Sequence, residues 1–320
     1  MQWVRDQVRK CPALHHALVA LVMYFWRQRE TLNRMTNSQK LKTITDFPLF
    51  APASAGSYAQ RASLTKEAIN QIFPFLVDMI EFPGRQSPPM PLPIEEFVVA
   101  STEKTAIAEL KQLFDHYGSD KSTAHNYHLL YGSILSDRTA AVKLAEIGLG
   151  SNDPAIVSNM GAKSAPGASL RAFAEFVPHG SIYGADIDEK ILFETDRIKT
   201  YFVDQTKPAS LKQLSDQLPG NFDLIIDDGL HSPHANIASL TALLPKLKQG
   251  GWYVIEDIAE AALPLWQVVS SLLSAGHQSW ILRSAQGYLL FVVRRLGPEG
   301  PHHTDRSIQN DSLLPPSSVR

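Results

Sequence analysis

Four acidic residues stand at the ends of two short apolar segments of the sequence. Asp227 and Asp228 close the first segment, and Glu256 and Asp257 close the second. If the segments are neighbouring parallel strands, which lie about 5 Å apart, the four carboxylates meet at one edge of a sheet. Neither motif contains a Lys or Arg to offset the repulsion between them. A divalent cation would offset it, and a few carboxylates completed by water and substrate oxygens suit Mg²⁺.

His231 follows Asp228 by three residues, so it reaches over the same sheet edge. Histidine titrates near neutral pH and therefore suits a general base that removes a proton from a hydroxyl. A metal beside that hydroxyl would lower the hydroxyl's pKa and hold it in line for reaction. The alternative is a solvated loop histidine, which the adjacent acids disfavour. We predict His231 as the catalytic base and place His234 in the first turn of the following helix.

A glycine turn after another apolar segment predicts a cofactor site. Glu146 lies in that segment, and Gly148 and Gly150 follow it closely. Such a turn lets a cofactor approach the backbone. A dinucleotide fingerprint would need a third glycine where Asp153 stands, and an anion there would repel a pyrophosphate. The Glu146 carboxylate instead suits the positively charged amino group and sulfonium of S-adenosylmethionine.

Acids also end the next two predicted strands. Asp186 can accept hydrogen bonds from both ribose hydroxyls, and Asp204 with Gln205 can bind the adenine amino group. Ordinary loop acids are the alternative interpretation. Three successive strands that end in acids, all at the edge where parallel sheets bind ligands, favour a cofactor site.

A parallel sheet with crossover helices would bring these residues together. Short β-rich segments alternate with helical patterns from residue 142 onward, and two later segments flank Gly287 without a helix between them. We predict an α/β, Rossmann-like sheet closed by an antiparallel hairpin at its edge, the arrangement of class I methyltransferases. The expected strands are Val142–Ile147, Ile182–Ala185, Thr200–Val203, Phe222–Ile226, Trp252–Ile255, Ser279–Leu282 and Leu289–Val293. The expected helices are Thr102–His116, Ser169–Phe176, Glu189–Thr195, Leu211–Leu218 and Ala235–Leu247.

The first hundred residues differ from the rest of the chain. They contain helical patterns and end in a proline-rich run at 83–93, which continues neither a helix nor a central strand. We therefore predict a mainly helical N-terminal region over 1–100 and a catalytic domain over 101–296. The tail, 297–320, has no periodic apolar face, and we expect it to be disordered.

One apolar stretch, Ala17–Trp26, raises the question of a membrane. A bilayer span needs roughly 20 residues, more than this stretch offers. We expect a buried or subunit-interface helix, and hence a homo-oligomer. Peripheral membrane contact through residues 12–27 and a secretion signal are the alternatives.

Composition restricts the partners and the compartment. The 30 Lys and Arg nearly balance the 32 Asp and Glu, the net charge is −2, and no basic block occurs, which argues against a nucleic-acid substrate. Cys11 is the single cysteine, so an intramolecular disulfide and a cysteine-based zinc site are excluded. We expect a cytoplasmic protein with a small-molecule or glycan acceptor.

The motifs together resemble a known group of enzymes. The chain is similar over residues 110–295 to the metal-dependent sugar O-methyltransferases of macrolide biosynthesis (the mycinamicin type), to rhamnosyl O-methyltransferases and to cephalosporin-hydroxylase-like proteins. The residues that carry the resemblance are Tyr117–Ser122, His125, Tyr127, Tyr131, Glu146–Gly148, Ile226–His231 and Val254–Asp257. Two departures are the long glycine loop Ser151–Pro166 and Leu230, which stands where a serine is expected.

The resemblance implies a function and a set of roles. It implies metal ligation by Asp228, Glu256 and Asp257, with His231 as base. It also implies that the stretch from Tyr117 to Tyr131 folds over the cofactor, so that Tyr117 and Ser119 contribute to cofactor binding. The implied reaction is Mg²⁺-dependent transfer of a methyl group from S-adenosylmethionine to a hydroxyl of a sugar, glycosylated natural product or polysaccharide. A phenol- or catechol-type O-methyltransferase and a non-catalytic binding protein of the same fold are the alternatives.

Overall fold

The computed structural model describes residues 73–74, 76–77, 87–98, 104–161 and 165–297. The chain divides into two compact units, residues 1–76 and 77–320, and every element named below belongs to the second unit. Residues 1–72 lie outside the described residues, and they include the apolar stretch Ala17–Trp26 and most of the predicted helical region. The tail after residue 297 also lies outside them. No described helix is long and apolar enough to cross a membrane.

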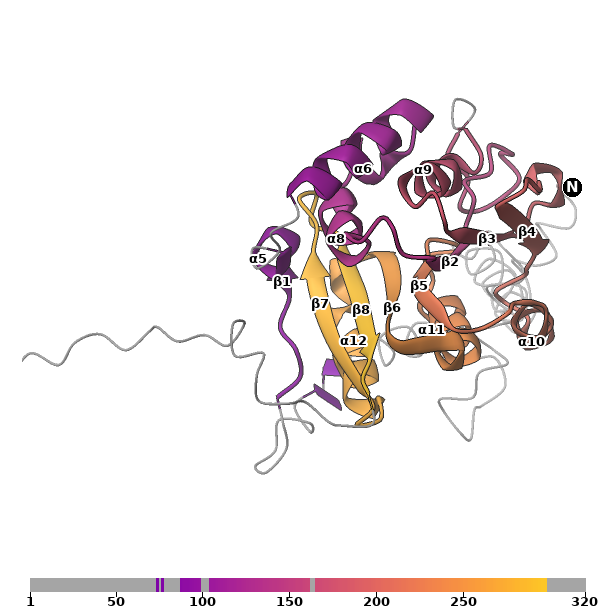
Figure 1. Cartoon of the computed structure of the whole chain (residues 1–320). Coiled ribbons are helices and arrows are strands. Elements are labelled where there is room, and N and C mark those ends of the chain that lie inside the picture. Colours follow the sequence, from indigo (N-terminus) through magenta and orange to yellow (C-terminus); the bar gives the residue numbers. More distant parts are fainter. Residues whose placement is uncertain (1–72, 75, 78–86, 99–103, 162–164, 298–320) are drawn as a thin grey trace, which may run out of the picture. The chain divides into compact units, whose positions relative to one another are not determined.

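The described strands form one eight-stranded sheet in the order β1-β7-β8-β6-β5-β2-β3-β4 (Figure 1). Neighbours from β6 through β4 run parallel, whereas β8 runs antiparallel to both β6 and β7. This confirms the predicted α/β sheet of parallel strands with an antiparallel hairpin. The strands are β1 (Leu92–Pro93), β2 (Lys143–Ile147), β3 (Ser181–Asp186), β4 (Ile198–Phe202), β5 (Phe222–Asp227), β6 (Leu247–Ile258), β7 (His277–Arg283) and β8 (Leu289–Arg295).

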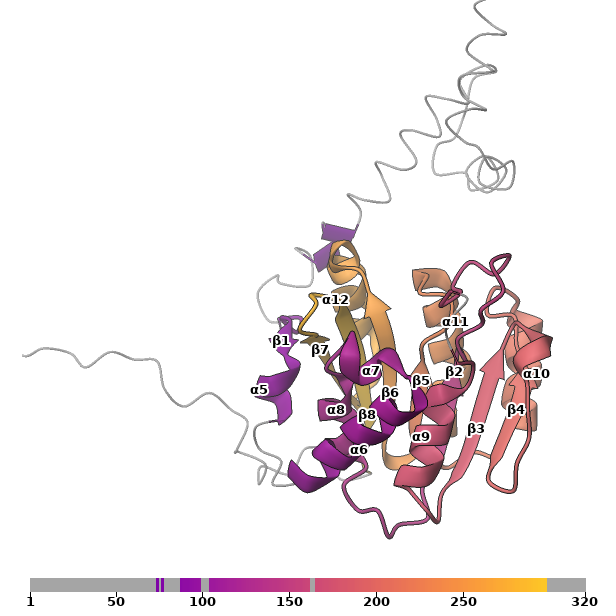
Figure 2. The same ribbon diagram turned by 90° about the horizontal axis from the view of Figure 1, so that it is seen from above.

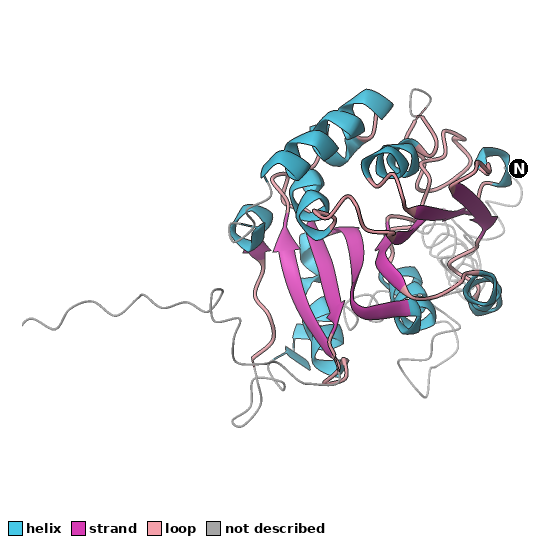
Figure 3. Ribbon diagram, viewed as in Figure 1, coloured by secondary structure: helices cyan, strands magenta, loops and turns pink. Residues whose placement is uncertain are grey.

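Helices cover both faces of the sheet, so that two apolar cores form (Figures 2 and 3). One face packs against α5 (Ile94–Val98), α6 (Lys104–Tyr117), α8 (Tyr127–Ile134) and α9 (Ala168–Phe176). The other face packs against α10 (Pro208–Gln217), α11 (Pro233–Leu243) and α12 (Leu263–Leu272). In α6 the buried residues Ala106, Leu110 and Phe114 recur every four positions, which places one apolar stripe on the sheet side.

Two helical expectations need correction. Glu189–Thr195 was expected to be a helix, but only a short 3-10 turn over Glu189–Ile191 forms, capped by the Asp188 carboxylate at the Lys190 amide. Glu194 then pairs with Lys199 in an antiparallel bridge, because the chain must turn at once into β4. In addition, α7 (Asp120–Thr123), α8 and α12 form where no helix was expected.

The proline-rich run leads directly into the sheet. Leu92 and Pro93 pair with the end of β7, and the side chains of Ile94 and Val98 are buried in the first core. A proline is compatible with this place because β1 is an edge strand. The compact unit therefore includes residues upstream of 101. The predicted boundary between an N-terminal region over 1–100 and a catalytic domain over 101–296 stays a prediction.

The carboxyl ends of β2, β5 and β6 form the edge that concerns function. Their register places Ile147 beside Asp227 and Asp227 beside Ile255, so the residues that follow each strand emerge together. Gly148 has a φ of +93°, and a Cβ on it would lie 2.0 Å from the Asp228 carbonyl oxygen. Glycine is required here because the loops after β2 and β5 touch.

Candidate active site

A buried lysine lies at the centre of the acid cluster. The Nζ atom of Lys121, from α7 (Asp120–Thr123), lies 2.6 Å from Asp228 Oδ2, 2.5 Å from Glu256 Oε2 and 3.2 Å from Glu146 Oε1. Its side chain is 2% exposed. The sequence analysis considered only a divalent cation for these acids, and the structure adds a lysine. The two acid motifs contain no Lys or Arg themselves, but α7 places one between them from more than a hundred residues away.

The electrostatics of this cluster follow from burial and close packing. Burial raises the pKa of the Glu256 carboxyl well above its usual range, and Asp228 adds to the effect. Burial also raises the pKa of Glu146. Burial alone would lower the pKa of the Lys121 ammonium, but the carboxylates around it raise that pKa well above its usual range. Tyr131 donates a hydrogen bond to the other carboxylate oxygen of Glu256, so both oxygens are engaged.

A second group of side chains opens toward solvent above this cluster. Asp228, His231 and Asp257 each offer one ligand atom, and these atoms lie within 4.8 Å of one another. The Oδ1 atom of Asp228 lies 3.9 Å from His231 Nε2, while its Oδ2 atom bonds to Lys121. Asp257 accepts a 2.5 Å hydrogen bond from the Tyr127 hydroxyl. Asp228 thus links the buried ion pairs to the exposed group.

The backbone in this exposed group is strained. His231 and Asp257 both have a φ of +54°, in the left-handed region that non-glycine residues adopt at a cost of about 1 kcal/mol or more. Asp and His tolerate this region better than most residues. Such outliers persist only where surrounding contacts hold them, and they concentrate at functional sites. With this backbone conformation, the ligand atoms of both side chains lie within 4.8 Å of Asp228.

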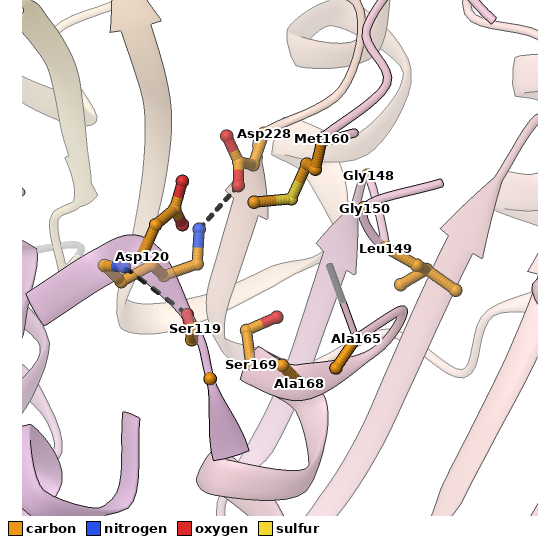
Figure 4. A pocket seen from close by; sticks show the side chains of 12 residues that line it. Ser119, Asp120, Gly148, Leu149, Gly150, Met160, Ala165, Ala168, Ser169 and Asp228 are labelled. Carbon is orange, nitrogen blue, oxygen red and sulfur yellow. Dashed lines mark hydrogen bonds and ion pairs between the residues drawn. The ribbon is translucent and has the colours of Figure 1, made fainter. Parts of the chain in front are cut away.

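A pocket lies beside Asp228, between α7 and the glycine turn after β2 (Figure 4). The first turn of α9 closes its lower side, and Met160, from the long glycine loop, closes the opposite side. That loop is folded, since the Met160 amide donates to the Ser151 carbonyl at 2.8 Å. The residues lining the pocket are Gly118–Lys121, Gly148–Gly150, Met160, Ala165, Ala168, Ser169 and Asp228.

The predicted cofactor residues divide into those that line the pocket and those that support it. Ser119, Gly148 and Gly150 line it. Glu146 lies behind it, where its carboxylate accepts a 2.7 Å hydrogen bond from Ser169 and faces Lys121 rather than open space. Tyr117 lies away from the pocket, and its hydroxyl donates to Glu175 at 2.7 Å.

Asp186 and Gln205, two further predicted cofactor residues, hold loops at the same edge of the sheet. Asp186 accepts hydrogen bonds from the Leu149 amide at 2.7 Å and the Asp188 amide at 2.8 Å, so it supports the glycine turn. Gln205 bonds through its amide to Asp227 at 2.8 Å and to the Leu230 amide at 2.8 Å, so it fixes the loop after β5.

Asp204 accepts from its own loop. Its Oδ1 atom accepts hydrogen bonds from the amide and the hydroxyl of Thr206, and its Oδ2 atom pairs with Lys207 at 2.8 Å. Desolvation opposes these contacts, but they hold the pKa of Asp204 below its usual range. The described partners of its side chain thus come from the loop that follows β4, and its backbone amide donates to Ser210 of α10.

The exposed group of Asp228, His231 and Asp257 fits a divalent cation. Two partly exposed carboxylates converge there and offer the oxygen ligands that Mg²⁺ takes, and the His231 imidazole lies beside them. Glu256 was predicted to be a third carboxylate ligand. It lies in the buried ion pair instead, with Lys121 on one oxygen and Tyr131 on the other.

Three functional side chains carried no individual role in the sequence analysis. Lys121, Tyr127 and Tyr131 all belong to the segment that resembles the sugar O-methyltransferases, and all three reach the acids after β5 or β6. Their spacing in α7 and α8 was visible in the sequence. Their partners were not, because the contacts join residues 107 to 135 positions apart.

Comparison with known proteins gives one family match and several curated relatives. Residues 164–258 match a family model described as a methyltransferase domain. Over 220 residues the chain is 32% identical to the 8-demethyl-8-alpha-L-rhamnosyl tetracenomycin-C 2'-O-methyltransferase of Streptomyces olivaceus, which is 68% of this chain and 52% of that protein. Over 98 residues it is 43% identical to the demethylmacrocin O-methyltransferase of Streptomyces fradiae, 31% of this chain and 25% of that protein. The chain therefore spans about half or less of the length of these relatives.

Among solved structures, one similar chain is the MycE methyltransferase from the mycinamycin biosynthetic pathway in complex with Mg, SAH and mycinamycin VI. It is 26% identical, with a TM-score of 0.49, and the match covers 61% of this chain and 56% of that one.

Proposed function

We propose that this chain, which carries a methyltransferase domain, is a Mg²⁺-dependent O-methyltransferase that transfers a methyl group from S-adenosylmethionine to a sugar hydroxyl of a glycosylated natural product. One observation carries the proposal: Asp228, His231 and Asp257 converge beside a pocket built from the glycine turn after β2. The relatives with rhamnosyl and macrolide substrates in their names support the acceptor class.

The pocket suits the methionine part of the cofactor. Its floor is the first turn of α9, where backbone amides and the positive end of the helix favour a carboxylate. Gly118 has a φ of +76°, and a Cβ on it would meet no atom within 4 Å, so this wall leaves room for a ligand. When bound, S-adenosylmethionine supplies the methyl group. We retain Asp186, Asp204, Gln205 and Tyr117 as proposed cofactor residues.

Asp228 and Asp257 would hold the divalent cation, whose chemistry is to lower the pKa of a hydroxyl beside it. Lys121 bonds to the Oδ2 atom of Asp228, which leaves the Oδ1 atom on the side of His231. Tyr127 fixes Asp257 in the same way. Glu256, predicted as a third ligand, is retained as a buried carboxylate beside the cation site that pairs with Lys121.

His231 would accept the proton of the acceptor hydroxyl. Its side chain is 31% exposed, which gives it contact with solvent for release of that proton. Its Nε2 atom lies 3.9 Å from Asp228 Oδ1, so the ring faces the carboxylate beside which the acceptor hydroxyl would lie.

The remaining partners follow from composition. We infer a small-molecule or glycan acceptor rather than nucleic acid, because the net charge of −2 gives no attraction to phosphate backbones. We further propose a homo-oligomeric, cytoplasmic protein.

Isotope transfer tests the proposed function. The full chain is incubated with methyl-labelled S-adenosylmethionine, Mg²⁺ and either 8-demethyl-8-alpha-L-rhamnosyl tetracenomycin C or a catechol. We expect label in the rhamnoside. Label only in the catechol would replace the proposal with a phenol-type enzyme, and label in neither together with tight binding of S-adenosylhomocysteine would indicate a binding protein.

A further inference from the structure

Three aromatic rings lead from the surface to Asp257. The His125 ring stacks on Tyr127 with a centroid distance of 4.6 Å and an interplanar angle of 11°. On its other side Tyr288 approaches it edge to face, with centroids 5.8 Å apart. Tyr127 donates its hydroxyl hydrogen bond to Asp257, and His125 Nε2 lies 3.9 Å from the same carboxylate oxygen. We call Tyr288, His125 and Tyr127 the aromatic ladder.

The ladder is assembled from two segments that Asn126 ties together. Its side-chain oxygen accepts a 3.0 Å hydrogen bond from the Ala285 amide in the β7–β8 turn, and its nitrogen donates to Glu95 of α5 at 2.6 Å. The turn that carries Tyr288 is therefore fixed against the segment that carries His125 and Tyr127. A preorganised surface of this kind reduces the entropic cost of binding.

Burial falls along the ladder from the inside outward. Tyr127 is fully buried and the His125 side chain is 9% exposed, whereas Tyr288 is 45% exposed. An aromatic ring that is half exposed beside a cluster of catalytic-type residues presents a flat apolar face to a ligand. The buried Nδ1 atom of His125 has no hydrogen-bond partner among the described residues. The exposed end of the ladder is thus an apolar ring face, which suits a ligand with an apolar face of its own.

We propose that the aromatic ladder is the subsite for the sugar ring of the acceptor, with Tyr288 as the platform on which the ring packs. This inference rests on the proposed function and adds the residue that recognises the acceptor. The ring that bears the reacting hydroxyl must lie near Asp257, and the ladder ends at Asp257. Carbon-bound hydrogens on one face of a sugar are attracted to the negative face of an aromatic ring, while its hydroxyls remain free at the edge.

Equilibrium binding tests the subsite without turnover. The affinity of 8-demethyl-8-alpha-L-rhamnosyl tetracenomycin C is measured by calorimetry on the full chain, with S-adenosylhomocysteine and Mg²⁺ present. Tyr288→Ala should weaken this affinity about tenfold, the usual value of one aromatic contact. Tyr288→Phe should stay within about twofold of wild type, because the ring and not the hydroxyl forms the platform. Leu272→Ala, which removes an exposed apolar side chain on α12 (77% exposed), is the matched control and should change nothing.

The outcomes separate this inference from the proposed function. Unchanged rhamnoside affinity in Tyr288→Ala, with methyl transfer to the rhamnoside intact in wild type, would overturn the subsite and leave the function standing. A wild-type protein that binds and methylates only a catechol would overturn both. Parallel loss of S-adenosylhomocysteine affinity in Tyr288→Ala would also count against the subsite, since it would show a general effect on the fold.

Discussion

His231 and His234 lie three residues apart, yet only His231 faces the acids. Its Nε2 atom is near Asp228, whereas His234 bonds to Ser232 on the exposed first turn of α11. We predict that His231→Ala lowers turnover by roughly 10²- to 10⁴-fold, the usual contribution of a general base. Activity should recover in part at high pH, where the acceptor hydroxyl ionises more readily.

Steady-state kinetics and Mn²⁺ titration check the role of His231 together. His234→Ala is the control and should retain wild-type turnover. Mn²⁺ affinity should be unchanged in His231→Ala and reduced in Asp257→Asn. If His231→Ala loses as much Mn²⁺ affinity as Asp257→Asn, His231 is a ligand and not the base.

Lys121 provides a second prediction at the scale of the residue. Lys121→Met leaves buried carboxylates without their cation, a change that costs about 3–5 kcal/mol of unfolding free energy. Lys111→Met is the control, because its ion pair with Asp115 is 46% and 38% exposed and such surface pairs contribute about 0.3–0.5 kcal/mol. Chemical denaturation measures both. Equal, small losses in the two variants would show that the cluster does not depend on Lys121.

The stability of Lys121→Met should also depend on pH. Burial raises the pKa of Glu256 and Glu146, so the folded state takes up protons at a higher pH than the unfolded chain does. Stability therefore rises as the pH falls toward 4.5, the ordinary value for Glu. The variant should regain part of its lost stability on acidification, whereas a cavity alone would give a deficit that is independent of pH.

Sequence alone predicted which acids gather at the sheet edge. It did not predict which of them would pair with a buried lysine and which would face solvent beside His231. Asp228 and Asp257 were expected there because each is the second acid of a pair that closes an apolar strand segment. Glu256 was expected to face a metal, and it faces Lys121 because α7 lies across the edge, a tertiary placement that no local pattern contains. Gln205 was expected, with Asp204, to bind the adenine amino group, and in the structure its side chain holds the loop after β5.

At the scale of elements, the turn after β2 depends on a glycine. Gly148→Ala combines a left-handed φ of +93° with a Cβ placed 2.0 Å from the Asp228 carbonyl oxygen. Gly250 has a similar φ of +78°, but a Cβ on it would meet no atom within 4 Å, so Gly250→Ala isolates the backbone term. We expect a loss of about 1 kcal/mol for Gly250→Ala and at least about 2 kcal/mol more for Gly148→Ala.

Thermal and denaturant unfolding of both glycine variants measures the difference, and S-adenosylhomocysteine binding reports on the pocket. Gly148→Ala should lose that binding and Gly250→Ala should keep it. Equal stability of the two variants would mean that the loops after β2 and β5 are not in contact.

Strands were predicted more accurately than helices in this chain. Buried parallel strands are short apolar runs that end in polar residues, and each of the seven expected strands overlaps an observed one. The helix expected over Glu189–Thr195 failed because Asp188 caps a single turn, after which the chain turns back to pair Glu194 with Lys199. Helices α8 and α12 were not foreseen, since their burial depends on packing against distant strands.

For the whole molecule, the described fold and site form one compact unit that contains the sheet, the pocket and the acids. The N-terminal region and the tail were predicted from sequence patterns, and most of the first and nearly all of the second lie outside the described residues. Acceptor choice is a property of the whole enzyme, and the chain spans 52% of the rhamnosyl O-methyltransferase to which it is similar. Its acceptor therefore stands as a proposal that rests on the ladder and the relatives together.

The central claim is that this chain transfers a methyl group to a sugar hydroxyl with a divalent cation held by Asp228 and Asp257. The most direct measurement is the rate of label transfer from S-adenosylmethionine to 8-demethyl-8-alpha-L-rhamnosyl tetracenomycin C as Mg²⁺ is added back to chelator-treated protein. The account predicts no transfer in EDTA, a saturable return of activity with Mg²⁺ in wild type, and no such return in Asp257→Asn. Full activity in EDTA would contradict it.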